Sequence, residues 1–215
     1  MFKKLLMAAT VAGAMVASSA NASTVTITGS MGTAGGVNDF AGEMSAAFSN
    51  LTFLSLASFS VSDNTALSFT GVAAESGISN SLTVDGAGTL TETSDFGSGT
   101  DLLTSWGIGS IGRSFSAGVL DSFFRFSNFG LVAAPGSLEL GVYVDGPLTD
   151  LGGGMFSVAT SVFFLAFDDN GAGPDDNHDD LLVRVNVVPL PAAAWMLLAG
   201  LASFGAIGYR RRQRA

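Results

Sequence analysis

The stretch Leu181-Leu182-Val183-Arg184-Val185-Asn186-Val187 decides the fold class of this chain. Its odd-numbered residues are all apolar, whereas Arg184 and Asn186 fall on the opposite face. Strict alternation over seven residues predicts a β-strand with one buried face. We therefore expect this segment to pack one face against a core and to build on neighbouring strands.

Segments of similar character recur along the chain. Glycine accounts for 28 of 215 residues, and Gly-rich turn signals separate short apolar runs, as at Asp85-Gly86 and Pro135-Gly136. The spacing of these runs and turns predicts a mainly β fold, an antiparallel, jelly-roll-like β-sandwich. The exception is the segment 39–48, which favours a short helix. The expected strands cover residues 24–28, 51–61, 66–72, 81–85, 88–92, 123–129, 138–144, 157–167 and 181–187.

The C-terminus has three parts in a fixed order. Val188-Pro189-Leu190-Pro191-Ala192 comes first, an uncharged run from Ala192 to Tyr209 follows, and Arg210, Arg211, Arg212 and Arg214 close the chain. Eighteen helical residues extend about 27 Å, which is just enough to cross a thin hydrocarbon core. The arginines would then remain on the cytoplasmic side. An ordinary C-terminal membrane anchor would explain the same run.

This order resembles the bacterial PEP-CTERM sorting signal in its VPLPA-type variant, with Leu190 where the more common form has glutamate. The resemblance covers Val188 to Arg214 and includes Trp195 within the span. It implies that the chain is a substrate of an exosortase, a membrane-embedded, cysteine transpeptidase-like enzyme. Such an enzyme is thought to cut near the Pro-x-Pro box and to release or transfer the protein to the cell surface.

The N-terminus predicts export. Lys3 and Lys4 precede a short apolar segment, and Ala20-Asn21-Ala22 has the small-x-small form of a signal-peptide cleavage site. We expect residues 1–22 to be removed, residues 23–187 to form one exported domain, and residues 188–215 to be the sorting signal. The protein would be held transiently in the inner membrane and then reach the cell surface or the exterior.

The exported body is strongly acidic. All 18 acidic residues lie in it, against Arg113, Arg125 and Arg184, so its formal charge is 3 − 18 = −15. Nucleic acid is excluded as a partner because phosphate binding needs a basic face. Solubility alone would explain this charge. The chain has no cysteine, so disulfides, cysteine nucleophiles and cysteine-based zinc sites are excluded.

One acidic loop is a candidate calcium site. Residues 168–180 hold six aspartates between two predicted strands, and calcium prefers hard oxygen ligands. The alternative is a solvated turn in which Asp and Asn cap backbone groups. The expected ligands are Asp168, Asn170, Asp176, Asp179 and Asp180.

Other chemistry is less well supported by the sequence. Gly107 to Gly112 matches the letters G-x-G-x-x-G, but no helix is expected after it, so we interpret it as a turn. We expect a non-enzymatic surface or matrix protein, adhesive or associated with exopolysaccharide. Two alternatives remain: a secreted hydrolase with two facing carboxylates, and a calcium-dependent carbohydrate-binding module. The module would expose aromatic side chains, for which the candidates are Trp106, Phe123, Phe124 and Tyr143.

Overall fold

The computed structural model describes residues 23–32, 51–73, 79–91, 110–128, 130–169 and 180–188. Most of these residues lie in β-strands, and the helical content of this part is one 3₁₀ turn, η3 (Asp121–Phe123). The expected helix at residues 39–48 and the C-terminal span lie outside it. The strands are β1 (Val25–Met31), β2 (Leu51–Val61), β3 (Thr65–Ala73), β4 (Ser81–Val84), β5 (Gly88–Thr91), β6 (Ser110–Phe115), β7 (Gly118–Val119), β8 (Phe124–Ser127), β9 (Val132–Ala133), β10 (Leu140–Asp145), β11 (Thr149–Gly152), β12 (Met155–Thr160), β13 (Val162–Phe167) and β14 (Leu181–Val188).

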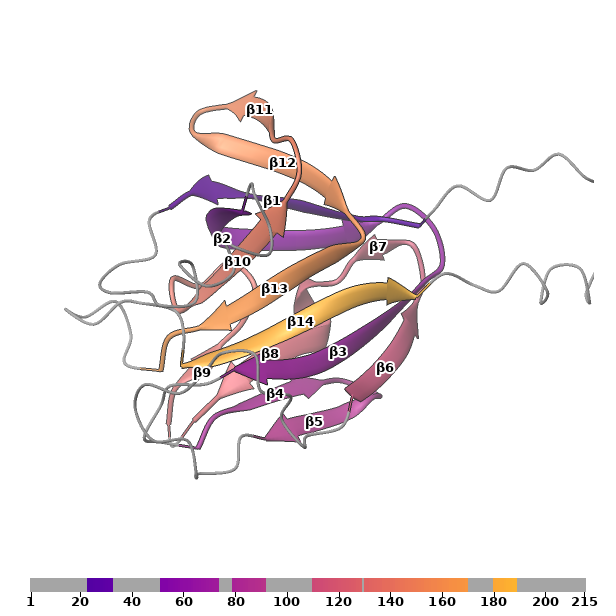
Figure 1. The fold of residues 1–215 in the computed structure, drawn as a ribbon, viewed down its shortest axis with the longest axis vertical. Coiled ribbons are helices and arrows are strands. Elements are labelled where there is room, and N and C mark those ends of the chain that lie inside the picture. Colours follow the sequence, from indigo (N-terminus) through magenta and orange to yellow (C-terminus); the bar gives the residue numbers. More distant parts are fainter. Residues whose placement is uncertain are drawn as a thin grey trace, which may run out of the picture. The chain divides into compact units, whose positions relative to one another are not determined.

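The strands form two antiparallel sheets. The larger sheet has the order β11-β12-β1-β2-β10-β13-β14-β3-β6, with β7 paired to β2, and the smaller has the order β5-β4-β8-β9. Figure 1 shows the larger sheet from β11 at the top of the view to β6 below, with β4, β5, β8 and β9 along its lower half. The predicted mainly β, antiparallel character is confirmed.

Strand β14 lies inside the larger sheet. It pairs with β13 on one side, from Phe167↔Leu181 to Val162↔Asn186, and with β3 on the other. The four side chains predicted to face a core are at most 8 % exposed, whereas Arg184 on the opposite face is exposed. The alternation in the sequence therefore identified the strand and its core-facing residues, whereas the opposite face is only partly exposed, since Leu182 there is also fully buried.

One hydrophobic core joins the two sheets. Phe124 of β8 makes an edge contact with Phe59 of β2, with ring centroids 5.0 Å apart. Phe126, also on β8, stacks on Phe167 of β13 at 5.2 Å and an interplanar angle of 14°. Aromatic pairs at such distances stabilise a core by about 0.5–1.5 kcal/mol beyond their area burial. The two sheets thus share one core, which gives the body a β-sandwich-like character.

Strand β2 changes partners along its length. Its first half, Leu51 to Ser55, pairs with β10, while the residues from Leu54 onward pair with β1. A β-bulge lies where the two regions meet, and Leu56 there has a φ of 52°, in the left-handed region that favours glycine. Across from it, a Cβ on Gly29 would lie 2.8 Å from the Ser55 carbonyl oxygen. The close approach of β1 and β2 therefore requires glycine at position 29.

Some strand boundaries differ from the prediction. The expected strand 157–167 is two strands broken at Ser161, because the chain pairs with β1 before that residue and with β10 and β14 after it. Leu138 lies before β10 rather than in it and is 54 % exposed. Part of the glycine-rich segment expected as a turn, from Ser110 to Gly112, belongs to β6 and pairs with β3.

Candidate functional site

The acidic loop begins and ends where β13 and β14 meet. Asp168 and Asp169 directly follow β13, and Asp180 directly precedes β14. Asp168 is fully buried, and its backbone N–H donates to the Glu139 carbonyl oxygen at 2.9 Å. The other expected calcium ligands, Asn170, Asp176 and Asp179, lie outside the described residues. The structure therefore places only the two ends of the predicted site.

Hydrogen bonds join these ends to the smaller sheet. The Asp169 N–H donates to the Asp180 Oδ2 at 2.7 Å, and the Asn80 Nδ2 donates to the Asp169 Oδ2 at 3.0 Å. The Asn128 Nδ2 donates to the Asp169 carbonyl oxygen at 3.0 Å. We call these four residues, Asn80, Asn128, Asp169 and Asp180, the polar hub. Asn80 is fully buried, whereas the other three residues are partly exposed, so the hub connects the two sheets at the edge of the core.

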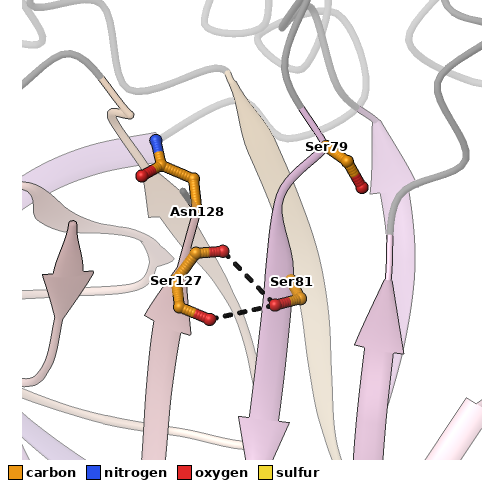
Figure 2. A pocket seen from close by; sticks show the side chains of 4 residues that line it. All are labelled: Ser79, Ser81, Ser127 and Asn128. Carbon is orange, nitrogen blue, oxygen red and sulfur yellow. Dashed lines mark hydrogen bonds between the residues drawn. The ribbon is translucent and has the colours of Figure 1, made fainter. Parts of the chain in front are cut away.

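A shallow hollow borders the hub. It has a volume of about 330 Å³ and is lined by Ser79, Ser81, Ser127 and Asn128. Figure 2 shows these four side chains and the bonds from Ser81 to Ser127, whose hydroxyl oxygens lie 3.0 Å apart. Because hydroxyl and amide groups both donate and accept hydrogen bonds, such a lining suits a hydrated cation or a hydroxyl-rich ligand.

The hub has the chemistry but not the complete ligand set of a calcium site. Carboxylate and amide oxygens are the ligands that calcium prefers. Within the described ranges, however, no group of three or more His, Cys, Asp or Glu residues is placed to hold a metal. Asp169, Asn80 and Asn128 were not among the calcium ligands predicted from the sequence. For the two asparagines the reason is that an asparagine beside a strand is too common a signal.

Two of the four candidate aromatic residues are not exposed. Phe124 and Tyr143 are 2 % exposed, the first in the core between the sheets and the second in another apolar cluster on the far face of the larger sheet. Phe123 is partly covered, with the Arg113 guanidinium 4.6 Å from its ring centroid. Trp106 lies outside the described residues. Phe124 and Tyr143 are therefore not available as exposed aromatic side chains for a sugar, because both serve packing.

Two arginines of the body hold the turn between β4 and β5. The Arg113 guanidinium donates to the Asp85 carbonyl oxygen, and Arg125 forms an ion pair with the Asp85 carboxylate at 3.2 Å. That ion pair is about half exposed, and such pairs contribute about 0–1 kcal/mol. These basic groups are already engaged in holding the turn.

The sorting motif is visible only at its first residue. Val188 ends β14, opposite Ala66 of β3. Pro189, Leu190, Pro191, Ala192 and the C-terminal arginines lie beyond the described part, as do Ala20 and Ala22. No helix within the described ranges has both the length and the apolar character to cross a membrane.

In comparisons with known proteins, no family model matches the chain and no curated protein shows significant sequence similarity to it.

Proposed function

We propose that the protein is an exported, exosortase-processed component of the cell surface or extracellular matrix with a non-enzymatic, structural or adhesive role. In this proposal residues 1–22 are a removed signal peptide. The body is a closed, jelly-roll-like sandwich, and the uncharged run from Ala192 to Tyr209 is a transient membrane span. The partners are the processing enzyme and a matrix polymer such as an exopolysaccharide.

The observation that carries this proposal is the order of parts after the last strand. The Pro-x-Pro box begins one residue beyond Val188, where β14 ends. Proline has no N–H to donate to a strand ladder, so Pro189 ends the strand without a linker. A cut within or after the box would leave every described strand in the released body. This arrangement supports a tail that is removed without loss of the fold.

Mass spectrometry of the mature protein tests the proposal. We expect a first residue near Ser23 and no peptide that contains Arg210 to Arg214. Replacing both Pro189 and Pro191 by alanine should leave the tail attached and the protein in the membrane fraction. The matched control is Pro147→Ala, because Pro147 is an exposed proline of the body. A mature protein that keeps its C-terminal arginines would reject the sorting signal.

A calcium-dependent carbohydrate-binding module is the second candidate, and the polar hub with its adjoining hollow favours it. Extracellular modules bind calcium with Kd values of about 10⁻⁴ to 10⁻³ M. At ~10 mM calcium, linkage predicts about 1.4–2.7 kcal/mol of stabilisation. For a domain of this size that corresponds to a rise in Tm of roughly 3–10 °C.

Melting curves with calcium or with a chelator test this candidate. The double variant Asp176→Asn, Asp179→Asn should lose the rise in Tm. The control Asp63→Asn, Asp145→Asn removes the same charge from exposed positions and should keep the rise. Magnesium should substitute poorly, because it demands a smaller and more regular octahedral site. Identical curves with and without calcium would leave the loop as a solvated turn.

A further inference from the structure

Both ends of the body leave the larger sheet at the same place. Val25, two residues after Ser23, lies opposite Thr160, and the Val187 N–H donates to the Ser161 carbonyl oxygen at 2.8 Å. Each such pairing places two Cα atoms about 5 Å apart, and chain neighbours are 3.8 Å apart. Val25 and Val187 are therefore within about 14 Å of each other. In Figure 1 the first residues of β1 and the last residues of β14 lie on the same side of the view.

The polar hub lies at the other end of β14. Asp180 precedes the first residue of this strand, and Val188 is the last. At about 3.3 Å per residue, the first and last residues of this eight-residue strand lie roughly 23 Å apart. The body thus has a terminal end, marked by Val25, Val188 and the turn at residues 62–64, and a hub end.

Charge differs between these two ends. The terminal end carries Ser62, Asp63, Asn64 and Ser161, which are small polar residues with a single acid. The hub end carries Asp169 and Asp180, and the sequence adds three more aspartates between them. Membranes with anionic lipids repel carboxylates. The terminal end is therefore the one that can approach a lipid surface at lower electrostatic cost.

The chain between the body and the expected span is very short. Only three residues, Pro189 to Pro191, separate Val188 from Ala192. Even fully extended, this segment reaches roughly 14 Å. A chain whose tail spans a bilayer must hold its terminal end close to that bilayer.

We propose that the membrane-anchored protein rests its terminal end on the phospholipid surface and displays the polar hub away from it. This inference rests on the proposed function, because it requires the tail to span the membrane. It adds a fixed orientation: the end with the acidic loop faces the exterior before the tail is cut. A ligand of the hub could then be bound while the protein is still anchored.

Single-cysteine labelling tests the orientation, and the absence of native cysteine makes the labels unique. The chain without its signal peptide, residues 23–215, would be reconstituted into vesicles of phosphatidylcholine and anionic phosphatidylglycerol that contain a lipid-linked acceptor dye. Asp63→Cys places a donor at the terminal end. Gly130→Cys places one near Asn128 of the hub, where a new side chain meets open space. We expect clearly stronger energy transfer to the lipid from Asp63→Cys.

A spacer variant separates tether length from other causes. Inserting twelve Gly/Ser residues between Val188 and Pro189 adds a mean reach of about 19 Å. The difference between the two labels should then largely disappear. If it persists, or if both labels transfer equally without the spacer, the short-tether argument is wrong. If residues 23–215 fail to float with vesicles, the span and the orientation are overturned together, whereas flotation with equal transfer would overturn the orientation alone.

Discussion

The contact between Phe126 and Phe167 is the sharpest test of how the two sheets are joined. Phe126 belongs to the smaller sheet, is fully buried, and stacks on Phe167 of the larger sheet. Truncation of a buried phenylalanine to alanine costs about 3–5 kcal/mol, because transfer energy is lost and a cavity remains. For a domain of this size, each kcal/mol lowers Tm by about 2–4 °C. We therefore expect Phe126→Ala to lower Tm by roughly 6–20 °C.

The assay is thermal unfolding of the body followed by circular dichroism. Arg125→Ala is the matched control, because Arg125 is the adjacent residue on β8 and is about half exposed. It should cost about 1 kcal/mol or less. A double-mutant cycle with Phe126→Leu and Phe167→Leu should show a coupling of about 0.5–1.5 kcal/mol. If Phe126→Ala costs no more than Arg125→Ala, the sheets do not pack through this pair and the shared core is wrong.

Two further substitutions test the bulge between β1 and β2. Leu56→Gly should be more stable than Leu56→Ala by about 1 kcal/mol, because both variants lose the half-exposed side chain but only glycine accommodates the positive φ. Urea unfolding measures the difference. Equal unfolding midpoints would show that the backbone at position 56 is not strained. Gly29→Ala should destabilise the body by about 1–3 kcal/mol, since its Cβ would lie 2.8 Å from the Ser55 carbonyl oxygen. The control in the same experiment is Gly130→Ala, whose new Cβ meets open space. An equal loss of stability in this control would contradict the close-approach argument.

Local patterns were sufficient to predict most of the individual strands. The expected segment 51–61 coincides with β2, and 81–85 and 88–92 match β4 and β5 to within one residue. Alternation and turn residues are local signals, and they work where a strand has one covered face and ends at a glycine turn. The pairing order is not local. Nothing in the sequence of β14 shows that it inserts between β13 and β3.

The candidate site was predictable only in part for the same reason. The acidic loop is visible as a cluster of letters, so its two ends were identified by Asp168 and Asp180. Asn80 and Asn128 enter the hub because β4 and β8 carry them to the end of β13. Their sequence separations from Asp169, 89 and 41 residues, leave no local signal. A hub assembled from both sheets can be recognised only once the sheets are placed.

Alternation also leaves open which faces of a strand are covered. In β14 the polar residues Arg184 and Asn186 suggested a solvent-facing side, and Arg184 is indeed exposed. Leu182 lies on that same side, yet it is fully buried in a second apolar cluster with Phe53, Tyr143 and Phe164. The two-residue period assigns a side chain to one face of a strand, whereas its burial depends on what packs against that face.

The aromatic residues considered for sugar binding show why this difference matters. Tyr143 belongs to this second cluster, so an aromatic side chain on the outer face of a sheet is evidence for a binding platform only after its exposure is known.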